Sequence, residues 1–234
     1  MSFSYHSLVE QKIKTAQAIA AGCCEGTYAD GALILCSLIS GMAAIAWPGK
    51  RTDKKRFVEI IIRFPPLGVD PKKISAPLLV QYGKDCNARL GISEKSFHVA
   101  EANDLSEEDV MKSCPGLGLL NIRKYSYAAL LYDEIRNNYV HQCRRGEKTR
   151  EGDSLRQIAH TEESSISYVN ENRNGKEYRL IYFPIKWIAR VAEGVARGLD
   201  IEVRQRGKML FDDLCFELPA MWWLDGARLG PWSR

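Results

Sequence analysis

An arginine and a histidine stand five positions apart in the stretch RNNYVHQCRRG, which runs from Arg136 to Gly146. The guanidinium of Arg136 is a planar fork of N–H donors that matches the oxygens of a phosphate group. Histidine, as at His141, is the side chain best suited to take and give a proton near neutral pH. Together the two residues could bind an anion and move a proton beside it.

The spacing of this pair is weak evidence by itself. With 18 arginines and 4 histidines in 234 residues, about 0.3 such pairs are expected by chance. Cations near a helix C-terminus also have an ordinary structural use, because they interact with the exposed carbonyls and the helix dipole there. Catalytic and structural interpretations are therefore both open for Arg136 and His141.

Helix geometry sets a condition on the catalytic interpretation. Five residues along a regular α-helix rotate two side chains by about 140° and separate them by about 7.5 Å. Either the helix unwinds between Arg136 and His141, or two copies of the motif meet across a two-fold axis, which predicts a homodimer. Asn137 and His141 are four residues apart and share one face, so we expect the amide of Asn137 to orient the imidazole.

The context of the pair carries more information than its spacing. The motif closes an amphipathic helix, Asn137 follows the arginine directly, and a basic fringe comes just after it: Arg144, Arg145, Lys148 and Arg150. Together these features resemble the R-x4-6-H signature of the HEPN superfamily, the higher eukaryotes and prokaryotes nucleotide-binding domain. HEPN domains are helical bundles, and many are metal-independent endoribonucleases that work as dimers.

The resemblance implies an RNA-cleaving homodimer that needs neither metal nor cofactor, acting as a toxin or defence effector restrained by a partner protein. Arg136 and His141 would be catalytic, Asn137 would orient the imidazole, and the basic fringe would bind RNA through Arg144, Arg145 and Lys148. The fringe is equally well explained as a solvated surface. A non-catalytic helical module that binds RNA, a nucleotide or a partner protein is the alternative function.

The elements that must position these residues are predicted to be mainly helical. The positions of Ala128, Leu131, Tyr132, Ile135 and Tyr139 form one apolar helical stripe ahead of the motif. Further helices are expected from a capping box at Ser7 to about Gly22, over residues 29–47 and 53–64, from Asp70-Pro71 to Gln81, after the capping box 106–109, and from Pro184 onward.

One β signal interrupts the helices. Asn174-Gly175 lies between two arms rich in Tyr, Ile and Val, which predicts a hairpin with a type I′ turn over about residues 164–183. The whole chain, 1–234, is expected to form a single HEPN-like domain, with the aromatic segment 207–234 packing back on the bundle.

Composition limits the class of protein. The chain is 45% hydrophobic with a net charge of +4, so it has enough apolar residues for a core and is not a general polycation. Seven cysteines, an odd number, and an N-terminus without a secretory layout favour a reduced, cytoplasmic protein. The apolar run 29–47 is interpreted as a buried helix, and a single membrane span is the alternative.

Overall fold

The computed structural model describes residues 5–22, 27–47, 53–82, 104–113, 117–150 and 165–205. This part of the chain is mainly helical, with a two-stranded antiparallel sheet before the last helix, as predicted. The elements are α1 (Tyr5–Ala20), α2 (Thr27–Ala46), α3 (Asp53–Arg63), α4 (Ala76–Tyr82), α5 (Glu107–Ser113), α6 (Leu119–Arg123), α7 (Tyr127–Leu130), η3 (Leu131–Asn137), α8 (Asn138–Gln142), β1 (Ser167–Arg173), β2 (Lys176–Tyr182) and α9 (Ile185–Gln205).

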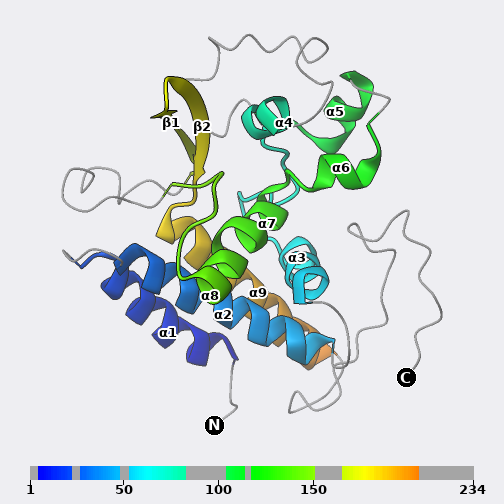
Figure 1. Cartoon of the computed structure of the whole chain (residues 1–234). Coiled ribbons are helices and arrows are strands. Elements are labelled where there is room, and N and C mark those ends of the chain that lie inside the picture. Colours follow the sequence, from blue (N-terminus) through cyan, green and yellow to red (C-terminus); the bar gives the residue numbers. More distant parts are fainter. Residues whose placement is uncertain are drawn as a thin grey trace.

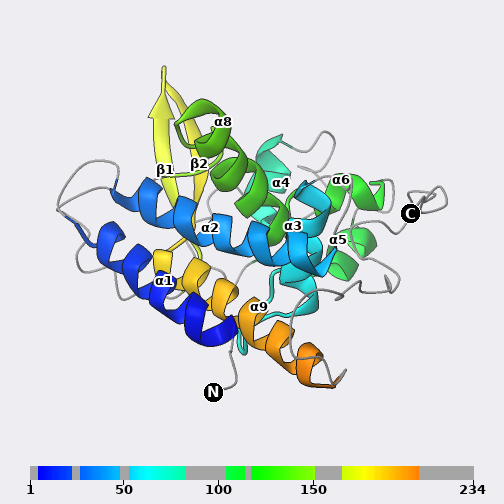
Figure 2. The same ribbon diagram turned by 90° about the horizontal axis from the view of Figure 1, so that it is seen from below.

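Three long helices, α1, α2 and α9, lie side by side and form the base of the molecule (Figures 1 and 2). Gly31 allows the close packing of α1 and α2, and Gly198 allows Phe64, which follows α3, to pack on α9. A Cβ on Gly31 of α2 would lie 2.6 Å from the carbonyl oxygen of Ala16 on α1, and a Cβ on Gly198 of α9 would lie 2.2 Å from the ring of Phe64. Larger residues at either place would push the neighbouring segments apart.

Helix α2 is the predicted helix over residues 29–47. Leu35, Cys36 and Ile39 are fully buried on the side that packs against its neighbours, whereas Ser37 and Gly41 are exposed on the other side. Within the described ranges α2 is the one helix long and apolar enough to cross a membrane, and core helices of soluble proteins meet the same criterion. Its partners α1, α3, η3 and α9 give it the packing of a core helix.

The motif lies at the end of a helical segment made of three parts. Ser126 caps it by accepting a hydrogen bond from the backbone N–H of Ala129. The chain then continues through α7, through the wider π-helical turn η3, and into α8, which ends at Cys143 with a left-handed φ of 51°. The five residues of the predicted apolar stripe are all buried: Ala128, Leu131, Tyr132, Ile135 and Tyr139.

The predicted hairpin is observed between β1 and β2. Asn174 and Gly175 have φ values of 54° and 79°, as a type I′ turn requires. After the motif helix the chain runs back along β2, where Thr149 forms a parallel bridge with Ile181. The hairpin is therefore attached to the loop that follows the motif.

Two predicted helix starts are wrong. Ser7 lies inside α1, which already includes Tyr5, so it does not cap that helix. Asp70 accepts a hydrogen bond from the backbone N–H of Lys72 in a turn, and α4 begins only at Ala76. Ile74, which lies between Asp70 and α4, is held in an extended conformation by bridges to Leu105 and Ser126, so the helix begins only after it. The predicted docking of residues 207–234 lies outside the described residues.

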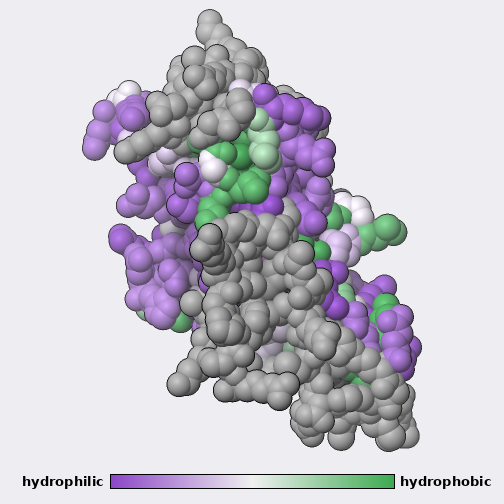
Figure 3. All heavy atoms as spheres, turned by 90° about the vertical axis from the view of Figure 1, so that its right-hand side faces the viewer, coloured by the Kyte–Doolittle hydropathy of each residue, from purple (hydrophilic) through white to green (hydrophobic). Residues whose placement is uncertain are grey.

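The side of the molecule that carries α3, α5 and α6 in Figure 1 faces the viewer in Figure 3. Most described side chains visible there are hydrophilic, and the hydrophobic ones gather in small groups between them. A small second core lies beneath this region, formed by Ile74, Leu79, Val110 and Ile122.

Candidate functional site

Arg136 is turned toward helix α3. Its guanidinium donates to the carboxylate of Asp53 at 3.2 Å and to the hydroxyl of Tyr132 at 3.3 Å. It also lies 5.3 Å from the centroid of the Tyr132 ring, within cation–π range. The side chain retains 15% of its exposure, so it is largely covered but still reaches solvent.

His141 is more exposed than Arg136. It stands on the last turn of α8 and is exposed to solvent. Asn137 is half-buried at the junction of η3 and α8. In the described part of the chain no hydrogen bond joins the Asn137 amide to the imidazole, and the orienting role of Asn137 stays a prediction.

The segment between the two motif residues is not a regular α-helix. Arg136 belongs to η3, whose π-helical winding ends at Asn137, and the α-helical turn that carries His141 follows. Such π segments are rare and often occur at functional sites. Yet no hydrogen bond joins Arg136 to His141 within the described chain, and the guanidinium is paired with Asp53 of α3. The irregular winding does not create a shared site inside one chain.

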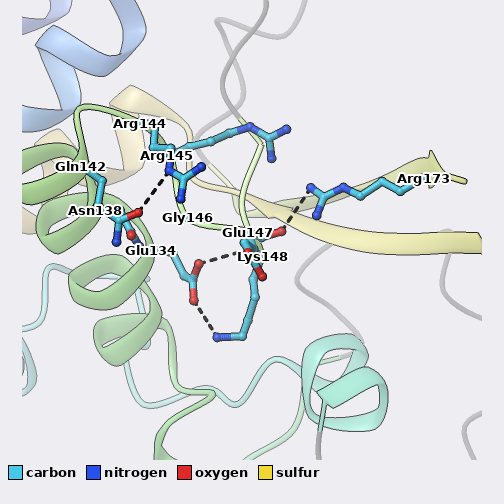
Figure 4. A pocket seen from close by; sticks show the side chains of 9 residues that line it. All are labelled: Glu134, Asn138, Gln142, Arg144, Arg145, Gly146, Glu147, Lys148 and Arg173. Carbon is cyan, nitrogen blue, oxygen red and sulfur yellow. Dashed lines mark hydrogen bonds and ion pairs between the residues drawn. The ribbon is translucent and has the colours of Figure 1, made fainter.

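Three residues of the basic fringe, by contrast, line a pocket of about 750 Å³ beside the motif helix (Figure 4). Arg150 is not part of its lining. One wall is the helix face formed by Glu134, Asn138 and Gln142, and the other walls come from residues 144–148 and from Arg173 on β1. Arg144, Arg145 and Lys148 were predicted to act together, and all three lie in this pocket. Arg173 was not predicted.

A partly buried ion pair fixes the loop against the helix. The Glu134 carboxylate, whose side chain is 6% exposed, accepts hydrogen bonds from the Lys148 ammonium at 2.7 Å and from the Lys148 backbone N–H at 3.2 Å. Burial alone lowers the pKa of Lys148, but the hydrogen bond and charge of Glu134 outweigh it, so the pKa is raised. Lys148 therefore stays charged near neutral pH.

Gly146 allows the loop to lie this close to the motif helix. Its backbone N–H donates to the carbonyl of Glu134 at 2.8 Å. A Cβ at this position would lie 2.0 Å from a Glu134 carboxylate oxygen and 2.8 Å from the Asn138 amide nitrogen. Only a residue without a side chain fits between the loop and the helix here.

The arginines of the pocket are anchored but not saturated. Arg145 donates to the carbonyl of Thr149 and to Glu171, and Arg173 donates to Glu171 at 2.8 Å and to the carbonyl of Glu147 at 3.3 Å. Arg144 donates to Gln142 at 3.1 Å. A guanidinium has five N–H donors, so each arginine keeps donors for a ligand.

The electrostatic balance of the pocket favours anions. Its lining holds four cations, Arg144, Arg145, Lys148 and Arg173, against the two carboxylates of Glu134 and Glu147. A third carboxylate, Glu171, pairs with Arg145 and Arg173 from outside the lining, which leaves an excess of one positive charge. Phosphate groups bind well to arginine forks that keep free donors.

His141 is not one of the residues that line the pocket, but its place in α8 brings it near them. It follows Asn138 by three residues within the α-helical turn, and side chains three apart are neighbours on a helix surface. An anion held among the pocket cations would therefore lie near an accessible imidazole, while Arg136 of the same chain is paired with Asp53 of α3.

No family model, curated protein or solved structure matches the chain. Among the described residues there is also no group of three or more His, Cys, Asp or Glu side chains arranged to hold a metal ion. The likeness to HEPN proteins thus rests on the motif and its context.

Proposed function

We propose that this protein is a HEPN-type endoribonuclease that cleaves RNA without a metal ion and acts as a cytoplasmic toxin or defence effector restrained by a partner protein. One observation carries the proposal of RNA as substrate. Three basic residues that follow the motif, Arg144, Arg145 and Lys148, converge in a pocket, and the exposed His141 follows the pocket residue Asn138 by three positions in α8. A solvated basic surface would not require such convergence.

The chemistry needs a base, an acid and a cation. A base takes the proton from a ribose 2′-hydroxyl, whose oxygen then bonds to the adjacent phosphorus. The bond from phosphorus to the 5′-oxygen breaks, and an acid protonates that oxygen. The products are a 2′,3′-cyclic phosphate and a 5′-hydroxyl. We assign proton transfer to His141 and stabilisation of the developing negative charge to Arg136.

The ion pair of Arg136 with Asp53 does not prevent this role. Asp53 is half-exposed, and it accepts a second hydrogen bond from Arg56 at 2.6 Å. When Arg136 turns to a substrate phosphate, Arg56 still neutralises Asp53. The substrate phosphate replaces Asp53 as the anionic partner of the guanidinium, so the exchange costs little.

A second copy of the chain supplies what one chain lacks. Because Arg136 is paired with Asp53 and no hydrogen bond joins it to His141 among the described residues, we propose that the active protein is a homodimer in which motif residues of both chains meet. The exposed side of α2, with Ser37 and Gly41, is our candidate dimer face. Helix α2 contacts α8, whose Val140 next to His141 is 43% exposed.

A specific observation favours one alternative. The engagement of Arg136 with Asp53 and with the Tyr132 ring is what a purely structural arginine would show. The second candidate is therefore a non-catalytic module that binds RNA, a nucleotide or a partner protein through the same basic pocket.

Cleavage of RNA in the presence of EDTA distinguishes the two functions. We expect the wild type to cut unstructured RNA, and His141→Ala and Arg136→Ala to lose about 10²-fold or more of that activity, as for a lost acid–base or charge-stabilising group. His6→Ala on α1 is the matched control and should cut like wild type. Intact RNA with the wild type, or alanine variants that cut as well as the wild type, would contradict the nuclease assignment.

A further inference from the structure

We infer that the pocket between the motif helix and the hairpin binds the phosphodiester backbone of single-stranded RNA next to the cleavage position, and that Arg173 of β1 is an RNA-binding residue. The choice of RNA rests on the proposed function. The assignment of the pocket to a phosphate-bearing chain rests on its own residues.

The lining of the pocket points to phosphates. Cations approach it from two separate segments, the loop with Arg144, Arg145 and Lys148, and strand β1 with Arg173 (Figure 4). All described lining residues except Gly146 are polar or charged, and none of them is aromatic. Bases in single-stranded RNA are held mainly by stacking on aromatic rings, whereas arginines and lysines hold the backbone.

The pocket is built before any ligand arrives. The Glu134–Lys148 ion pair and the fit of Gly146 hold the loop on the helix. On the opposite side Glu171 accepts hydrogen bonds from both Arg145 and Arg173, which ties the loop to the hairpin. Fixed cations lose little conformational entropy on binding, which raises affinity for a matching anion.

The position of the pocket favours a chain over a small ion. Its volume of about 750 Å³ lies in the range of sites that hold whole small molecules, far above the needs of one phosphate. The edge formed by Asn138 is next to His141 on the same helical turn. An RNA strand with one phosphate in the pocket would thus continue toward His141, the residue assigned to proton transfer.

The test is binding of a fluorescent RNA oligonucleotide with 2′-O-methyl groups, which cannot be cleaved by 2′-hydroxyl attack. Anisotropy is measured at several salt concentrations. We expect Arg173→Ala to weaken binding about tenfold, the effect of losing a charged hydrogen bond, and to reduce the slope of log K against log salt by about 0.7. His141→Ala should bind within about twofold of wild type, because the imidazole faces the cleavage position.

Two further variants make the test sharp. Lys176→Ala removes the same charge from the same hairpin at a position that does not line the pocket, and should change affinity less than about twofold. Glu147→Gln removes a carboxylate that lines the pocket, and it should tighten binding about threefold because like charge no longer repels the phosphate. A gain of affinity cannot result from misfolding.

The outcomes separate this inference from the proposed function. If Lys176→Ala weakens binding as much as Arg173→Ala, or if Glu147→Gln does not tighten it, the inference is overturned. It is also overturned if AMP displaces the oligonucleotide more effectively than unlabelled oligonucleotide does. Pocket-dependent binding by a protein that never cuts RNA would leave the inference standing and reject the nuclease. RNA cleavage with a KM that Arg173→Ala does not change would support the nuclease and reject this inference.

Discussion

Asp104 is a buried carboxylate that joins the hairpin to the helices. Its side chain accepts hydrogen bonds from the hydroxyls of Tyr127 and Tyr168 and, at 3.0 Å, from the backbone N–H of Ala76. Burial raises the pKa of Asp104 to about 6, although the hydrogen bonds from both tyrosines oppose the shift. Because Tyr168 belongs to β1, the charge state of this one residue affects how firmly the hairpin is held.

The sign of the resulting pH dependence follows from linkage. The ordinary pKa of 3.8 applies to the unfolded chain, so the folded chain binds the proton more tightly between pH 4 and 6. The contribution of Asp104 to the free energy of unfolding should therefore fall as pH rises through this window, by about 3 kcal/mol in total. Urea denaturation at pH 4 to 7 measures it, and Asp104→Asn should lack this component. Parallel pH profiles for the two proteins would contradict the prediction.

Among the elements, the loop of residues 143–150 has the strictest steric requirement. We expect Gly146→Ala to lower the free energy of unfolding by about 1–3 kcal/mol, because the new methyl group collides with Glu134 and forces the loop away from the helix. Gly41→Ala is the control, since a Cβ there meets nothing within 4 Å, and it should add about 0.5–1 kcal/mol by helix propensity. Chemical denaturation compares the two, and equal effects would show that the loop is not tightly seated.

The success of prediction also differed from element to element. The hairpin was predictable because Asn174-Gly175 encodes its turn locally, and the stripe from Ala128 to Tyr139 was predictable because burial repeats at the helical period. The start of α4 was not, because Ile74 pairs with residues distant in sequence, Leu105 and Ser126. Pairing between residues distant in sequence therefore overrode the local capping signal at Asp70.

At the scale of the whole molecule, the pocket shows what sequence patterns do not contain. Arg144, Arg145 and Lys148 adjoin the motif and were found by proximity. Arg173 joins them only because the loop bridges β2 at Thr149 and Ile181, which brings the whole hairpin beside the motif helix. An arginine in a hairpin arm has no local feature that signals such a contact.

The proposed dimer is the property of the whole molecule on which the proposed catalysis would depend. The exposed side of α2 carries Ser37 and Gly41, and the apolar side chains around them have intermediate exposure: Ile34, Leu38 and Ile45. This side is therefore an apolar face with small residues at its centre. Small residues let two helices approach closely. In a dimer with two-fold symmetry, one substitution in this face is present on both sides of the contact.

Gly41→Arg should therefore convert a dimer to a monomer in light scattering and reduce RNA cleavage, without loss of folding, because the site has open space in the single chain. Two bulky cations would meet at the two-fold axis, where like charges repel. Gln11→Arg adds the same charge to the exposed side of α1 and should leave the dimer intact. A wild-type monomer would remove the composite site, whereas a Gly41→Arg protein that still dimerises would show that another face joins the chains.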